Sequence, residues 1–120
     1  MVGRSILVVD DEENFLTLLH WFLSERGYEI HTASSVDGAL SLVRERSFDV
    51  ALLDIRMGSA QDGLFLLEQL IQRLPDIKII MMTAYPTVSA IKQAFDRGAL
   101  HFVTKPVDLK ELSETINTLL

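Results

Sequence analysis

The run Val50-Ala51-Leu52-Leu53-Asp54 decides how this chain folds. Four consecutive apolar residues followed by a single carboxylate are typical of a strand buried on both faces, as in the middle of a parallel sheet. Such a strand presents Asp54 at its carboxyl end. Apolar runs at Ser5–Val9, 77–82 and 100–103 are also followed by polar residues, so we expect the polar ends of four strands to meet at one edge of a sheet.

Amphipathic segments between these runs predict helices. The first has apolar residues at spacing i, i+3, i+4, i+7 and i+8, namely Phe15, Leu18, Leu19, Phe22 and Leu23. The later helices are marked by an N-cap at Ser35, a stop at Pro75, an apolar face of Val88, Ile91, Ala94 and Phe95, and an N-cap at Asp108.

Five strands, the second predicted at 28–33, thus alternate with five helices over residues 1–120. Because each helix supplies the crossover that parallel neighbours require, we expect a single α/β domain with a doubly wound five-stranded parallel sheet. The second and fifth strands carry polar positions and should be the edges, and right-handed crossovers then favour the strand order 2-1-3-4-5. In this order the chain reverses direction between strands one and three, where sites form at the carboxyl ends of the strands.

Composition excludes several classes of protein. The net charge of -6 argues against direct nucleic-acid binding by this domain, because a phosphate backbone would be repelled. No apolar run approaches the roughly 20 residues of a membrane helix, and zero cysteines exclude disulfides. We therefore expect a cytoplasmic domain that contacts no membrane.

Three carboxylates are predicted at the reversal point, those of Asp10, Asp11 and Asp54. At about 4 Å, each pair repels by roughly 1 to 4 kcal/mol. An all-oxygen cluster suits a hard divalent cation, Mg²⁺ or alternatively Mn²⁺, which would offset that repulsion. The alternative is that Asp10 and Asp11 only cap the following helix, but a third carboxylate from another strand favours the metal.

Thr83 and Lys105 follow the fourth and fifth strands and are predicted at the same edge. Taken singly, they read as a strand-end hydroxyl bonded to backbone and a solvated surface lysine. Together with a metal they fit the stabilisation of charge on phosphoryl oxygens. A cis bond between Lys105 and Pro106 would point the lysine inward.

These residues occur within a set of short motifs in a fixed order. The motifs are Val8-Val9-Asp10-Asp11-Glu12, Leu53-Asp54-Ile55-Arg56-Met57, Asp62-Gly63, Thr83-Ala84, Gly98-Ala99 and Phe102-Val103-Thr104-Lys105-Pro106. No single motif is specific, but the whole set resembles the receiver domain of two-component response regulators, over essentially the whole chain. The resemblance implies a flavodoxin-like receiver fold.

The resemblance also implies roles for the acidic residues. Asp54 would accept a phosphoryl group from a histidine kinase or a phosphotransfer protein. Asp11, Asp54 and the backbone carbonyl of Arg56 would hold Mg²⁺ directly, and Asp10 would act mainly through water. The domain would catalyse only its own phosphorylation and slow dephosphorylation, so it would not be an enzyme in the usual sense.

Switching roles follow from the same resemblance. Thr83 and Lys105 would bind the phosphoryl oxygens, and Phe102 matches the family's switch aromatic, although an ordinary core phenylalanine is the alternative reading. Arg56 and Tyr85 occupy positions that tune the phosphoryl lifetime. The responsive surface would be residues 87–120. The segment 83–88 is similar to receivers fused to transcriptional effector domains, so this surface would bind a C-terminal effector domain. Alternatively, it would bind a second copy in a phosphorylation-dependent homodimer.

One segment departs from the family pattern. Where a proline usually follows methionine, this chain has Met57-Gly58, and the loop as far as Gly63 is one residue longer. Glycine loosens the backbone that proline would restrain, so the Arg56 carbonyl is expected to be held less firmly. The motifs therefore predict the metal site but not its affinity.

Three other functions are alternatives to the phosphoacceptor role. A flavin-binding domain of this topology needs a phosphate-binding loop after the first strand, where this chain has Asp10-Asp11-Glu12. A phosphohydrolase with an aspartyl nucleophile normally carries an Asp-x-Asp pattern on that strand, which is missing here. A phosphorylation-independent interaction module remains the alternative, although the full residue set is present.

Overall fold

The computed structural model describes residues 4–59 and 61–120, and in them five parallel strands form one sheet in the order β2-β1-β3-β4-β5. The strands are β1 (Ser5–Val9), β2 (Glu29–Ala33), β3 (Val50–Asp54), β4 (Lys78–Thr83) and β5 (His101–Thr104). The helices are α1 (Glu13–Ser24), α2 (Val36–Glu45), α3 (Asp62–Arg73), α4 (Val88–Asp96) and α5 (Leu109–Leu119). The predicted doubly wound α/β fold and its strand order are confirmed.

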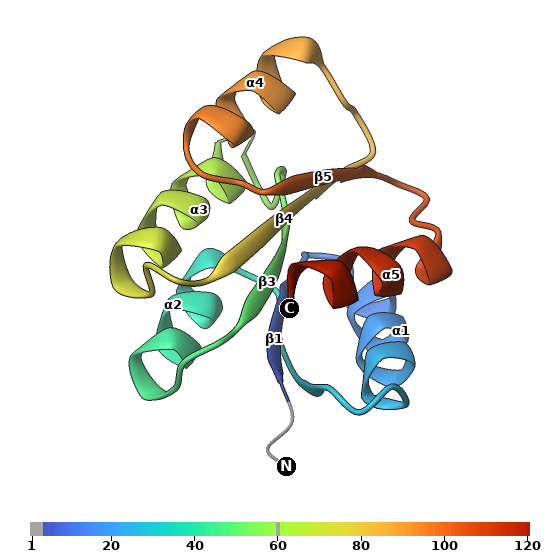
Figure 1. Cartoon of the computed structure of the whole chain (residues 1–120). Coiled ribbons are helices and arrows are strands. Elements are labelled where there is room, and N and C mark those ends of the chain that lie inside the picture. The colour runs from blue at the N-terminus through green and yellow to red at the C-terminus, as the bar shows by residue number, and fades with distance from the viewer. Residues whose placement is uncertain (1–3, 60) are drawn as a thin grey trace.

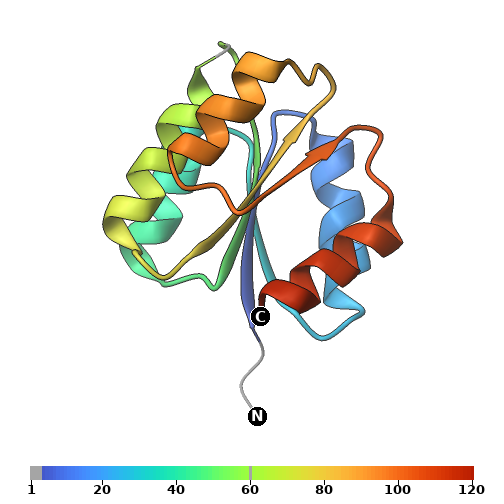
Figure 2. The same cartoon turned by 45° about the horizontal axis from the view of Figure 1, so that its top comes forward.

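The helices cover both faces of the sheet. Helices α1 and α5 lie on one face and α2, α3 and α4 on the other (Figure 1), and the tilted view shows the strands running edge-on between these two layers (Figure 2). Successive residues of one strand therefore enter different cores. Leu53 packs with the cluster under α2 and α3, whereas Leu52 packs with the cluster under α1 and α5.

The central strand explains why a continuous apolar run was needed. All five residues of β3 are buried, and β3 pairs with β1 on one side and β4 on the other. The edge strands β2 and β5 have partly exposed residues, as their polar positions predicted. Because Val9 pairs with Leu53 and Asp54 with Met82, the ends of β1, β3 and β4 lie side by side.

Several sequence-based boundaries shift by one residue. The second strand begins at Glu29 rather than at 28, the fourth covers Lys78–Thr83 rather than 77–82, and the fifth covers His101–Thr104 rather than 100–103. Hydropathy alone placed these ends, whereas in β4 and β5 the ladder of backbone pairing continues to the polar residues Thr83 and Thr104. The predicted caps are confirmed: Ser35 accepts from the Gly38 amide and Asp108 from the Glu111 amide.

Two predicted apolar faces are wrong in part. Leu18 of α1 is 41% exposed, and in α4 Val88 is 85% and Phe95 45% exposed, leaving Ala94 as the buried residue of α4. Helix α4 lies over the short edge strand β5, so the sheet offers it little apolar surface to cover. Among the described residues no helix is long and apolar enough to cross a membrane.

Candidate functional site

Three carboxylates meet at the carboxyl ends of β1 and β3. Asp10 and Asp11 follow β1, and Asp54 is the last residue of β3. Carboxylate oxygens of the three lie within 4.8 Å of one another. Asp10 is completely buried and Asp54 is 6% exposed, whereas Asp11 is exposed to solvent. The adjacency of the two strands therefore brings together the cluster that the sequence predicted.

Lys105 follows the edge strand β5 and contacts this cluster at the same carboxyl edge of the sheet. Its ammonium is 2.5 Å from Asp10 Oδ2 and 3.6 Å from Asp54 Oδ2. The remaining Asp10 oxygen, Oδ1, accepts a hydrogen bond of 2.9 Å from the Glu12 amide. The Lys105–Pro106 peptide bond is cis, as the sequence allowed. Burial of Asp10 is thus offset by two donors, one of them charged.

The aromatic ring of Phe15 completes the surroundings of the ammonium. Lys105 Nζ lies 4.9 Å from the ring centroid, within the range of a cation–π contact. Phe15 belongs to the apolar face of α1, and sequence reasoning assigned it only a packing role. No local signal could have revealed the contact, because its partner lies at the far end of the chain.

The electrostatics of the cluster act on Asp54 and Lys105. Burial raises the pKa of Asp54 to about 6, and the charge of Asp10 adds to this, while Lys105 and the Arg56 amide oppose it. For Lys105, burial alone lowers the pKa, but the hydrogen bond and charge of Asp10, with Asp54 and Glu12, outweigh burial and raise it. Lys105 is therefore a cation at neutral pH, and Asp54 is ionised at a cost.

The donors fit a hard divalent cation. All the candidate ligand atoms are carboxylate oxygens, and one carboxylate is open to solvent. Burial, and after it the charges of Asp10 and Asp11, raise the pKa of Asp54 despite the opposing charge of Lys105, so a bound cation would favour the ionised carboxylate. The Arg56 amide donates to Asp54 Oδ1 at 3.4 Å, so the chain turns tightly after Asp54 and keeps the Arg56 backbone beside the cluster.

Thr83 ends β4, the strand next to Asp54. It is 2% exposed, and its hydroxyl oxygen accepts a hydrogen bond of 3.1 Å from the Tyr85 amide, which leaves the hydroxyl proton free to be donated. Thr83 also lines a cavity of about 180 Å³ together with Ala90 and Gln93 of α4. Thr83 therefore lies at the end of the strand beside Asp54 and also borders the space next to α4.

The remaining predicted residues surround this centre. Arg56 places its guanidinium 5.9 Å from the centroid of the Tyr85 ring, and both residues line the cavity beside Thr83. Phe102 pairs with Met81 across the β4–β5 ladder and is partly buried against the core under α2, α3 and α4. Phe102 thus lies on the edge strand rather than in the carboxylate cluster.

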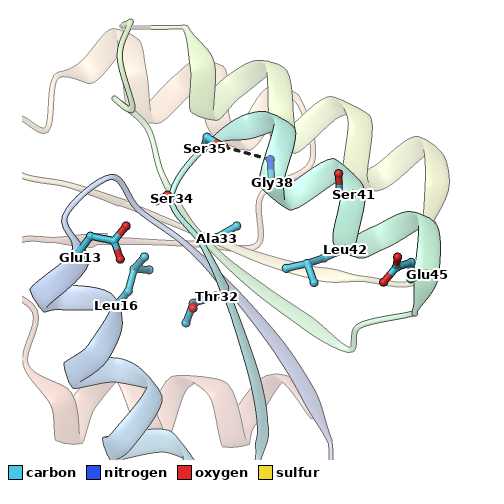
Figure 3. A pocket seen from close by; sticks show the side chains of 10 residues that line it. All are labelled: Glu13, Leu16, Thr32, Ala33, Ser34, Ser35, Gly38, Ser41, Leu42 and Glu45. Carbon is cyan, nitrogen blue, oxygen red and sulfur yellow. Dashed lines mark hydrogen bonds between the residues drawn. The ribbon is translucent and has the colours of Figure 1, made fainter.

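A second hollow lies beside the site, between α1 and α2 above the end of β2 (Figure 3). Its lining combines the hydroxyls of Thr32, Ser34, Ser35 and Ser41 with the carboxylates of Glu13 and Glu45. The dashed contact in Figure 3 is the Ser35 cap on the Gly38 amide. Two carboxylates and no cationic side chain among the described lining residues make this groove unsuited to phosphate.

Comparisons with known proteins agree on one family. The model of the response regulator receiver domain matches residues 6–117. The transcriptional regulatory protein ZraR of Salmonella typhimurium is 40% identical over 111 residues, which make up 92% of this chain and 25% of that protein. This chain therefore spans about a quarter of the length of such curated relatives.

Solved structures give the same picture. A CheY-like receiver domain protein from Methanospirillum hungatei superposes with a TM-score of 0.91 at 30% identity, covering 97% of this chain and 92% of that one. A response regulator from Burkholderia pseudomallei, solved with a phosphorylated aspartic acid, a calcium ion and citrate, superposes with a TM-score of 0.87 at 31% identity. That alignment covers 92% of this chain and 65% of that one.

Proposed function

This chain belongs to the response regulator receiver domains of two-component systems, and on that premise we propose that Asp54 is its phosphoacceptor, in a step that requires Mg²⁺. The observation that carries the proposal is the grouping of Asp10, Asp11 and Asp54 within 4.8 Å, with Lys105 against two of them. The Burkholderia pseudomallei relative, solved with a phosphorylated aspartic acid and a divalent cation, supports it.

In the proposed reaction, an Asp54 oxygen forms a bond to phosphorus while the bond from phosphorus to the donor histidine nitrogen breaks. The electron pair stays on the imidazole, which takes up a proton from solvent. Asp54 must be ionised to attack, and its pKa of about 6 leaves it mostly ionised at neutral pH. A bound Mg²⁺ would offset the charge of the carboxylates and of the phosphoryl oxygens.

The residues of this chain would divide the work. Asp11, Asp54 and the Arg56 carbonyl are proposed to hold the metal directly, and Asp10 to act through water. The Lys105 ammonium is already 3.6 Å from Asp54 Oδ2. It would stabilise the negative charge of a phosphoryl oxygen on Asp54 while remaining paired with Asp10.

Thr83 and Phe102 are proposed to convert phosphorylation into a change of shape. The Thr83 hydroxyl would turn to donate a hydrogen bond to the phosphoryl group. The Phe102 side chain would then move inward, into the space that Thr83 vacates. The cavity beside Thr83 supports this, because side chains there have room to rearrange. Phe102 has no hydroxyl, so its inward state would bury no unsatisfied donor.

Residues 87–120 are proposed to be the surface that responds. Val88, Phe95 and Leu100 expose apolar side chains on it, which is the kind of surface that a second copy or an effector domain would cover. The partners proposed for the whole protein are a histidine kinase or phosphotransfer protein, a C-terminal effector domain and a phosphorylation-dependent homodimer. A cytoplasmic location and one receiver domain over residues 1–120 complete the proposal.

Receiver domains are not enzymes in themselves, and we expect this one to catalyse only its own phosphorylation and slow dephosphorylation. The test is incubation with a small phosphodonor, with and without a metal chelator, followed by mapping of the adduct. We expect one metal-dependent adduct on Asp54 and none in Asp54→Asn. An adduct elsewhere, or full labelling in chelator, would contradict the proposal. No adduct under any condition would favour the phosphorylation-independent module.

A further inference from the structure

The loop from β3 to α3 is fixed at its base by backbone contacts. The Gly63 amide donates to the Ile55 carbonyl at 2.8 Å. A Cβ on Gly63 would lie only 2.3 Å from the Asp54 carbonyl oxygen and 2.5 Å from the Ile55 Cα. The first turn of α3 therefore rests directly on the backbone that follows the proposed phosphoacceptor.

The tip of the same loop is closed by side chains. The Ser59 hydroxyl donates to Asp62 Oδ1 at 2.7 Å, and the Ser59 amide donates to Asp62 Oδ2 at 3.2 Å. The Gln61 amide in turn donates to Ser59 Oγ at 3.3 Å. We call the paired contacts of Ser59 with the Asp62 carboxylate the Ser59–Asp62 clasp. Ala60, within this loop, lies outside the described residues.

Gly58 leaves room for the clasp. Its φ of +121° lies in the region that L side chains rarely adopt, and a Cβ at this position would come within 3.1 Å of Asp62 Oδ2. The restraint lost when glycine replaces the family's proline is thus supplied by the Asp62 carboxylate, through its contacts with Ser59. Proline would restrain the loop through its own ring, whereas here two hydrogen bonds to one carboxylate restrain the next residue.

The Arg56 carbonyl lies in the chain between the fixed base and the closed tip. Met57, which follows it, is 7% exposed and anchored in the core. We propose that the Ser59–Asp62 clasp positions the Arg56 carbonyl for a divalent cation, so that Ser59 and Asp62 are positioning residues of a site they do not touch. This inference rests on the proposed metal site of Asp11, Asp54 and the Arg56 carbonyl.

The experiment measures the dissociation constant of Mg²⁺ alone by calorimetry on this chain. Ser59→Ala and Asp62→Ala should each raise it by about 3- to 10-fold, less than is usual for groups hydrogen-bonded to a side-chain ligand, because only one ligand is loosened. The double variant should be no worse than Asp62→Ala, since both substitutions break the same contact. Ser59→Thr keeps the hydroxyl, so its dissociation constant for Mg²⁺ should equal that of the wild type.

Asp37→Ala is the matched control, because Asp37 and Asp62 are acids in the first turns of α2 and α3, and Asp37 is exposed to solvent. It should leave the Mg²⁺ affinity unchanged, and melting of each variant should show that the fold is kept. Wild-type affinity in both Ser59→Ala and Asp62→Ala, or additive losses in the double variant, would overturn the clasp. If Asp11→Asn does not weaken Mg²⁺ binding, the proposed metal site itself is wrong, and the clasp inference falls with it.

Discussion

Replacing Asp54 by asparagine should stabilise the metal-free protein. The asparagine keeps the size of the side chain and an oxygen that can accept from the Arg56 amide. It removes the negative charge of a residue that is only 6% exposed and that lies beside Asp10 and Asp11. Lys105 keeps its closer partner, Asp10, at 2.5 Å. The substitution thus removes repulsion without leaving a cation unpaired.

The raised pKa gives the size of the effect. The pKa of Asp54 moves from 3.8 to about 6, and each pKa unit corresponds to about 1.4 kcal/mol, so ionised Asp54 costs the folded state at most about 3 kcal/mol. An asparagine amide must also be desolvated, which takes back part of this gain. We expect a gain of about 1 to 3 kcal/mol in the free energy of unfolding at pH 7.5.

The sign of the pH dependence follows from proton binding. Between pH 4 and 6 folded Asp54 holds a proton that the unfolded chain has released, because its pKa rises to about 6 on folding. Stability contributed by this group is therefore present below about pH 4 and lost as the pH rises through about 6. The advantage of Asp54→Asn should accordingly be large at pH 7.5 and small at pH 4.5.

Urea unfolding of both proteins in chelator, at pH 7.5 and 4.5, measures this difference. Asp37→Asn makes the same chemical change at an exposed acid and should stay within about 0.5 kcal/mol of wild type. Mg²⁺ should shrink or reverse the order at pH 7.5, because it binds the wild-type cluster more tightly. Equal stabilities at pH 7.5, or a gain that does not depend on pH, would show that ionised Asp54 does not destabilise the folded state.

Three further predictions concern neighbouring groups. Lys105→Ala should lower metal-dependent labelling by at least about tenfold. It should also destabilise the metal-free protein by about 1 to 3 kcal/mol, because buried Asp10 loses its charged donor. Unchanged labelling well below the melting temperature would contradict the proposed contact of Lys105 with the phosphoryl group. Gly63→Ala should cost about 2 kcal/mol or more in urea unfolding, since its Cβ would meet the Asp54 carbonyl oxygen at 2.3 Å, and wild-type stability would show that the loop yields. In Thr83→Ala, amide exchange over residues 87–120 should no longer respond to a phosphoryl mimic, and a response equal to that of wild type would exclude the hydroxyl as the switch.

The strands of the sheet, and the edge of the sheet on which the site lies, could be predicted from the sequence. The apolar run Val50–Asp54 required a strand covered on both faces, and the helices between strands required parallel pairing. Parallel strands end at a common edge, so the register that pairs Val9 with Leu53 also brings Asp10 beside Asp54. Periodicity and strand direction are local properties, and for that reason they could be read from the chain.

Tertiary structure alone decided the contacts within the site and the exposure of the helices. The Lys105 ammonium lies nearer Asp10 than Asp54, over the ring of Phe15. This placement depends on how α1, which carries Phe15, and α5, which follows Lys105, pack against the sheet. The exposure of Val88 likewise depends on how little sheet lies beneath α4, because an apolar pattern shows which side chains could be buried and not whether a surface exists to cover them. The Ser59–Asp62 clasp arises from a backbone path through Gly58 that no spacing rule specifies.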